Sequence, residues 1–240
     1  MRAESPVSPA LVAWGNAWLA GHVGLDEAAD QVESVAGPTL IATVALRVHL
    51  ADLRSQGLHE VRLALPAPGD PLGLSGPPDF NAAAVDAGQA AIAVLAERNI
   101  GLVPEPDLRG SSYQGTAFTV HPAGPVRADL PSVAEAERDL AEAIRAATEA
   151  LTSVEGPGQA HPGQLERAGG ELAPGYPGRA HRVSALAARL AVMLRLADEG
   201  LGLTSAQMAT RSAALRQLDH AVRRATVAAH HAIFEPIRNP

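Results

Sequence analysis

The best place for chemistry in this chain is the Pro- and Gly-rich segment Pro66–Asn81, which carries Asp70, Ser75 and Asp79. An alternating apolar segment precedes it and an alanine-rich periodic segment follows, so we expect it to lead from a strand into the start of a helix. Ligands bind at such junctions in open α/β sheets, because free backbone N–H groups and the helix dipole converge there. Helix caps and turns use the same residue types, so a purely structural loop is the competing interpretation.

Two residues further along the chain could complete a hydrolytic site with this loop. Arg109 opens a polar segment between two expected strands, and His121 ends the second of them. Together with Asp70, Ser75 and Asp79 they would supply an acid, a nucleophile and a base. The spacings of a nucleophile elbow, a dinucleotide-binding loop and a P-loop are all missing. A small-molecule-binding protein or metal-independent hydrolase is therefore the alternative function and not the first.

The composition excludes several other chemistries. The chain has no cysteine and no lysine, so all 19 basic side chains are arginines. Without thiols there is no thiolate nucleophile, iron–sulfur cluster or disulfide, and arginine cannot act as a base or form a Schiff base. The nine histidines are scattered and no H-x-x-x-H pair occurs. We therefore predict neither a metal nor a cofactor.

Charge is distributed unevenly along the chain. Residues 1–178 hold 10 Arg against 22 Asp and Glu (-12), residues 179–240 hold nine Arg against four (+5), and the two sum to the net charge of -7. Arginines one heptad apart, at Arg182 and Arg189 and at Arg216 and Arg223, could contact the phosphates of a nucleic acid. An acidic helix over residues 132–155 that faces this basic pair of helices explains both charge runs, so the sequence favours packing within the molecule over nucleic-acid binding.

Hydrophobic periodicity predicts an α/β region over residues 1–125. Helices are expected at 11–19, 25–35 and 39–56, with Gly57 as a left-handed cap on the last. Strands are expected at 60–66 and 99–104, joined by a helix over 80–98 in a parallel βαβ unit, and a third strand at 115–121 is expected as a hairpin partner. We expect Pro77 in the first turn of the helix, with Ser75 or Gly76 as its cap. This is a small three-stranded sheet.

The second half, residues 131–240, predicts a bundle of three long helices. Apolar seams with three–four spacing mark these helices, and the seam of the second comprises Val183, Leu186, Leu190, Met193 and Ala197. Between the first and second helices, 11 of the 24 residues 155–178 are Gly or Pro, which predicts a flexible polar loop. The fold class is therefore α/β and mainly helical.

Three stretches carry a resemblance to a known group of proteins. They are LALPAPGDPLGLSGPPDFNAAAVDAG from residue 63 to 88, GYPGRA from residue 175 to 180, and the Ala/Arg-rich last helix. With them the chain resembles a family of uncharacterised actinobacterial proteins of similar length. The resemblance covers most of the chain and implies no activity, cofactor or catalytic residue.

These observations favour a non-catalytic protein over an enzyme. Helical seams and charge asymmetry are the strong signals, whereas no set of catalytic residues has a recognised spacing. We expect a cytoplasmic interaction or scaffold protein that pairs with a second copy or a protein partner through its helical faces. No apolar run is long enough to cross a membrane, so we expect no membrane contact.

Overall fold

A computed structural model of the chain describes residues 6–109, 113–125, 130–152, 170–197 and 205–235. It divides into two compact units. Unit 1 comprises residues 1–130, 172–176 and 233–240, and unit 2 comprises residues 131–171 and 177–232. No helix of the described residues is both long enough and apolar enough to cross a membrane.

Unit 1 is built on a six-stranded mixed sheet in the order β2-β1-β6-β5-β4-β3. Its strands are β1 (Thr39–Ile41), β2 (Val44–Ala45), β3 (Glu60–Ala64), β4 (Ala90–Val94), β5 (Asn99–Asp107) and β6 (Gly115–Ala123). Only the β1–β6 pair is parallel, and every other neighbouring pair is antiparallel. The expected hairpin of the strands at 99–104 and 115–121 is confirmed as β5–β6.

The predictions of a three-stranded sheet and of a parallel βαβ unit are wrong. The expected helix over 80–98 is instead α4 (Pro78–Ala87) followed by strand β4. Gly88, at φ 65°, ends α4 in the left-handed region and turns the chain into β4. Strand β4 then lies between β3 and β5 and pairs antiparallel with both, so β3 and β5 are not neighbours. A right-handed parallel crossover therefore does not exist here.

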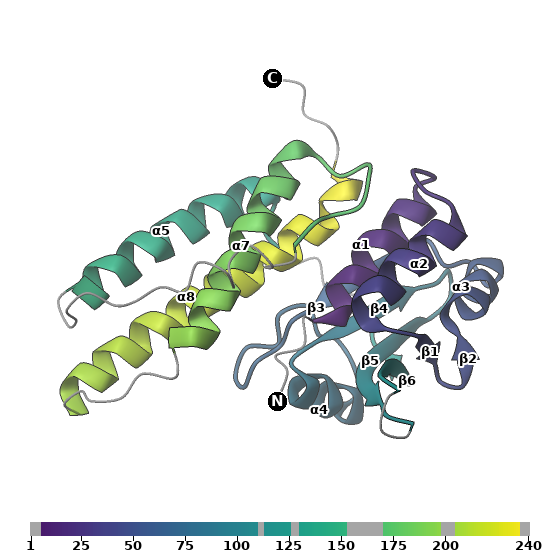
Figure 1. Cartoon of the computed structure of the whole chain (residues 1–240), viewed down its shortest axis with the longest axis horizontal. Coiled ribbons are helices and arrows are strands. Elements are labelled where there is room, and N and C mark those ends of the chain that lie inside the picture. The colour runs from purple at the N-terminus through teal and green to yellow at the C-terminus, as the bar shows by residue number, and fades with distance from the viewer. Residues whose placement is uncertain (1–5, 110–112, 126–129, 153–169, 198–204, 236–240) are drawn as a thin grey trace. The chain divides into compact units, whose positions relative to one another are not determined.

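Helices cover both faces of the sheet, with α1 (Val7–Leu19) and α2 (Leu25–Ala36) on one side and α4 on the other (Figure 1). Alternate residues of the strands point to opposite faces, and those on the α4 side form a core with the buried Phe80. That core contains Ala64, Phe80, Ala84, Ala90, Ile92 and Val103. The helices expected at 11–19 and 25–35 are confirmed as α1 and α2.

The helix expected over residues 39–56 begins later than predicted. The segment first forms the β1–β2 hairpin, with Ala42 at φ 54°, and only then the helix α3 (Leu46–Ser55). The β-branched residues of this segment, such as Thr39, Ile41 and Val44, explain why it begins as strands, because they favour strands. Its apolar side chains are nevertheless spaced as in a helix, which is why a helix was predicted. Gly57 has φ 92°, so the left-handed turn expected after this helix is present.

The end of the expected flexible loop, Leu172–Tyr176, is an ordered part of unit 1. Leu172, Ala173 and Tyr176 are buried, and the Tyr176 side chain is hydrogen-bonded to Asn16 of α1. We call Leu172–Tyr176 the strap. The prediction of a flexible polar loop is therefore wrong for these five residues. Residues 153–169 of the same predicted loop lie outside the described residues.

Unit 2 contains the three expected long helices, α5 (Val133–Thr152), α7 (Gly178–Ala197) and α8 (Ser205–His231). Helices α5 and α7 both pack on α8, which runs in the opposite direction to them (Figure 1). Ser132 and Glu135 form a capping box at the start of α5, because the Glu135 carboxylate accepts a hydrogen bond from the Ser132 N–H at 2.9 Å. The core of α5 comprises Val133, Ala136, Leu140 and Ala147.

Candidate functional site

The Pro66–Asn81 loop is ordered by its own backbone. Ala67 and Asp70 exchange two backbone hydrogen bonds of 2.9 Å, which close a tight turn around Gly69 at φ 80°. Further on, Leu72 is buried, and its carbonyl accepts a hydrogen bond from the Leu65 N–H at 3.3 Å. The ordered loop expected from the proline content is therefore present, and Asp70 belongs to the turn that orders it.

Ser75 and Asp79 lie on either side of the start of α4. The Ser75 carbonyl accepts a 2.6 Å hydrogen bond from the Gly124 N–H, which fastens the loop to the end of β6. The Ser75 hydroxyl oxygen is buried without a hydrogen-bond partner among the described residues. Asp79 is exposed in the first turn of α4, whose N-cap is Pro77. The prediction that Ser75 or Gly76 caps this helix is wrong, because the N-cap is Pro77 and no side-chain cap hydrogen bond is present.

His121 is half-buried on β6, beside the start of α4. Its ring centroid lies 5.9 Å from that of Phe80, and its Nε2 lies 3.1 Å from the Thr119 hydroxyl oxygen. That hydroxyl donates its only proton to the Val103 carbonyl at 3.2 Å. With that proton on Val103, Nε2 is the donor to the Thr119 oxygen. The imidazole is thus held in place by β5 and β6.

Arg109 lies at the other end of the β5–β6 hairpin. Its guanidinium binds the Asp107 carboxylate through two contacts, of 3.0 and 2.8 Å, and stacks 5.4 Å from the Tyr113 ring centroid. Asp107 pairs with Gly115, six positions along β6 from His121. At about 3.3 Å per residue this separation is roughly 20 Å. The hydrogen bond that the guanidinium donates to the Asp107 carboxylate also raises the pKa of Arg109.

The structure therefore does not bring the five predicted residues together. Ser75 and His121 both lie near the start of α4, whereas Arg109 is at the far end of the hairpin and Asp79 faces solvent. No group of three His, Asp or Glu side chains in the described part of the chain is arranged to hold a metal ion. Two hollows in the described part of the chain lie on α5 and α8 of unit 2.

Helix α7 carries an exposed surface at positions that the apolar periodicity predicted to lie in the core. Its buried residues include Ala180, Val183 and Ala187, whereas Leu186 and Met193 are 40% and 47% exposed. The predicted seam through Leu186 and Met193 is therefore wrong.

Arg182 and Arg189 are also exposed and share this side of α7. At 100° per residue, Arg182, Leu186, Arg189 and Met193 span only about 60° of the helix circumference. We call these four residues the α7 stripe. The three–four spacing of its arginines and apolar residues could have identified it, but a second apolar row with the same spacing, through Val183 and Leu190, hides it in the sequence.

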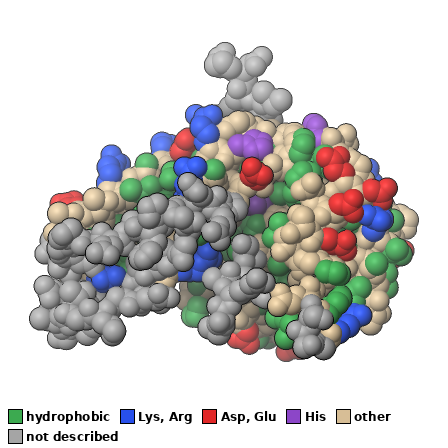
Figure 2. Space-filling model, viewed as in Figure 1, with side chains coloured by type: hydrophobic (Ala, Val, Ile, Leu, Met, Phe, Trp, Pro, Cys, Tyr) green, Lys and Arg blue, Asp and Glu red, His purple; other side chains and the backbone are tan. Residues whose placement is uncertain are grey.

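The acidic helix does not cover these arginines. Between α5 and α7 the described residues contain one ion pair, from Arg179 Nε to Glu137 at 3.2 Å. Arg223 pairs within α8 with Asp219 at 2.8 Å. Helix α5 does pack against α8 and α7, as expected, but Arg182, Arg189 and Arg216 are exposed, so the expectation that it accounts for the basic charges is wrong for these three arginines. Arginine and hydrophobic side chains lie beside one another on the visible part of the bundle (Figure 2).

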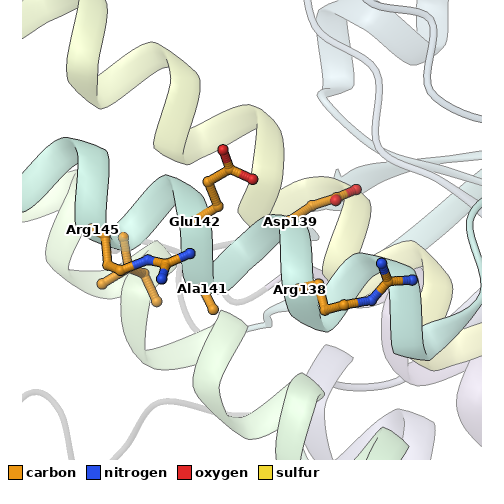
Figure 3. Close-up of a pocket in the computed structure, with 6 residues that line it drawn as sticks. Arg138, Asp139, Ala141, Glu142 and Arg145 are labelled. Carbon is orange, nitrogen blue, oxygen red and sulfur yellow. The ribbon is translucent and has the colours of Figure 1, made fainter.

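One of the hollows lies on the outer side of α5. Arg138 and Arg145 line it together with Asp139, Ala141, Glu142 and Ile144. Glu142 projects from one side of the helix and Ala141 from the other (Figure 3). Charges of both signs therefore stand close together on α5, in contrast to the α7 stripe, whose only charges are arginines.

A mixed α/β unit joined to a three-helix bundle, with an exposed arginine and apolar stripe on one helix, defines the architecture of this protein. Residues 8–135 match the N-terminal domain of the Rv1486c-like proteins, and residues 134–227 match their C-terminal domain. The chain therefore belongs to the Rv1486c-like protein family, which confirms the resemblance inferred from its sequence. No curated protein and no solved structure matches the chain.

Proposed function

We propose that this protein is a non-catalytic protein–protein interaction or scaffold protein that binds its partner through the α7 stripe. The observation that supports it is that Leu186 and Met193, 40% and 47% exposed, alternate along α7 with two exposed arginines. Arginine and methionine are enriched in protein interfaces, where the long arginine side chain also covers apolar surface.

A protein partner fits the α7 stripe better than a nucleic acid does. Apolar side chains occupy two of its four positions, and none of the four is an aromatic side chain that could stack on a base. Unit 2 holds 11 Arg against 11 Asp and Glu, whereas unit 1 holds eight against 15. Neither unit therefore has the net positive charge that phosphate binding uses.

The hydrolase alternative gains no support from the placement of its residues. Catalysis needs the nucleophile, base and anion-binding groups within a few ångströms of one substrate. Arg109 is committed to Asp107 at the far end of the hairpin, and the Asp70 backbone closes its own turn. A small-molecule site would have to form at the start of α4 from Ser75 and His121 without them.

A photo-crosslinking amino acid at position 186 tests the proposed function in cells that express the full chain. We expect a covalent adduct with a protein of defined mass at position 186. The matched control is position 108, since Leu108 is also an exposed leucine, 70% exposed, but directly follows β5 of unit 1. Equal labelling at both positions, or none at position 186, would show that the α7 stripe is not an interaction surface.

A further inference from the structure

Helix α5 carries an exposed stripe with three acidic residues, flanked on one edge by Arg138 and Arg145, whose acids match the arginines of the α7 stripe. Its members are spaced by three, four and three residues, and all are exposed: Asp139, Glu142, Ala146 and Glu149. They span about 80° of the helix circumference, so they share one side of α5. We call these four residues the α5 stripe. Its two glutamates are one heptad apart, as are Arg182 and Arg189.

The two stripes complement each other when the helices run antiparallel. Counting in opposite directions places Arg182 opposite Glu149 and Arg189 opposite Glu142. The same register places Leu186 opposite Arg145 and within one residue of the small Ala146. Two pairs of opposite charges on either side of an apolar contact are the means by which packed helices choose partner and register.

Within one chain the two stripes do not satisfy each other. The Arg179–Glu137 pair marks the side on which α5 and α7 approach one another, and α7 runs in the same direction as α5 (Figure 1). Glu142 and Asp139 project from the other side of α5 from Ala141 (Figure 3). None of the two arginines and two glutamates has an ion-pair partner among the described residues. Both stripes are thus exposed in the part of the chain that the structure describes.

We propose that the partner of the α7 stripe is the α5 stripe of a second copy of this chain, packed antiparallel to it. This inference rests on the proposed function and names its partner. Exposed ion pairs are individually weak and are screened by salt. The association is therefore expected to be reversible and to weaken as the salt concentration rises from 0.05 M to 1 M.

Charge exchange between the stripes tests the proposal in the full chain. The double variants Arg182→Glu/Arg189→Glu and Glu142→Arg/Glu149→Arg each place like charges opposite one another. Sedimentation equilibrium should show the wild-type mass rising with concentration above the 24.7 kDa of one chain. Each double variant should associate at least tenfold more weakly, while an equimolar mixture of the two should recover wild-type association.

A control and a folding check accompany these variants. Arg195 is exposed on α7 outside the stripe, so Arg195→Glu changes the charge of the same helix and should leave association unchanged. Circular dichroism melts establish that each variant is folded, and the fourfold variant, in which opposite charges face again, should associate as the wild type does.

Two results would overturn the inference. One is a wild-type chain that stays at 24.7 kDa at all concentrations, and the other is a mixture of the double variants that associates no better than each alone. If a different protein is crosslinked at position 186 while the chain stays monomeric, the proposed function stands and the self-association does not. If position 186 crosslinks to nothing, both fail.

Discussion

The Asn16 side chain of α1 pairs with the backbone of Val61 on strand β3 as a neighbouring strand would. Its Nδ2 donates to the Val61 carbonyl and its Oδ1 accepts from the Val61 N–H, both at 2.7 Å. Strand β3 is the last strand of the sheet, and an exposed edge strand offers unpaired N–H and C=O groups to other chains. One carboxamide therefore closes the middle of this edge.

Replacement of Asn16 by leucine should destabilise unit 1. Asn16 is fully buried, so the change leaves the Val61 N–H and C=O buried without partners, at a cost of about 2–4 kcal/mol. Urea denaturation measures the free energy of unfolding. Gln31→Leu, which changes an exposed amide on α2, serves as the control and should stay within about 0.5 kcal/mol of wild type. A loss no larger for Asn16→Leu than for Gln31→Leu would show that the carboxamide does not secure β3.

The strap should make unit 1 sensitive to alkaline pH through Tyr176. Burial raises the pKa of the Tyr176 phenol above its ordinary value of 10. A phenol whose folded pKa is raised favours folding of its neutral form, so this stability is present below pH 10 and falls as the pH rises further. In Tyr176→Phe the alkaline loss of stability should be smaller. Thermal melts between pH 8 and pH 11 check this, and identical pH profiles for the two proteins would contradict it.

Glycine at position 101 is required by the packing of α4 on the sheet. A Cβ at Gly101 would overlap the ring of Phe80, which fills the core on this side of the sheet. Gly101→Ala should therefore force the ring to move and cost about 1–3 kcal/mol. Gly24→Ala, where nothing lies within 4 Å of the added Cβ, is the matched control. Chemical denaturation of the two variants should separate them clearly, and equal stabilities would mean that the core yields without strain.

The sequence predicted long amphipathic helices better than short buried strands. Helices α1, α2, α5, α7 and α8 all have enough turns for their apolar period to be visible. Strand β4 does not, because Ala90-Ala-Ile-Ala-Val94 is apolar throughout and continues the alanine-rich pattern of α4. A central strand buried on both faces and a buried helix give the same short apolar run. Gly88, which adopts the left-handed conformation between α4 and β4, was the signal that separated the helix from the strand.

The candidate surface was hidden for a different reason. Periodicity shows that α7 has apolar rows, but it does not show which row meets α8. Both the row through Val183 and the row through Leu186 have three–four spacing, and only the tertiary packing decides between them. The placement of Arg109 depends likewise on the lengths of β5 and β6, nine residues each, which carry the hairpin tip far from His121.

Unit 2 should lose stability in mild acid through His230. The side chain is only 3% exposed, and its Nδ1 donates to the Thr226 carbonyl at 2.7 Å. Burial lowers the pKa of His230 from 6.5 to about 4. The stability that depends on the neutral ring is therefore complete above pH 6.5 and is lost as the pH falls toward 4.

One pKa unit corresponds to about 1.4 kcal/mol, so this loss amounts to roughly 3 kcal/mol. His230→Gln, which cannot take up the proton, should flatten the acid limb of stability against pH, although it lowers stability at neutral pH. Helical circular dichroism followed between pH 3.5 and pH 8 measures both effects. An acid limb of unchanged steepness in His230→Gln would assign the transition to other groups.

The choice between the two rows of α7 can be tested directly by removing one side chain from each. Val183 is 2% exposed and Leu186 is 40% exposed. Val183→Ala removes fewer atoms but leaves a cavity in the bundle, and should cost about 2 kcal/mol of unfolding free energy. Leu186→Ala removes more atoms from a surface site and should change stability by no more than about 0.5 kcal/mol. Guanidinium denaturation at low protein concentration keeps association out of the comparison. The reverse order of losses would place Leu186 in the core, and the α7 stripe would then not be available to a second copy.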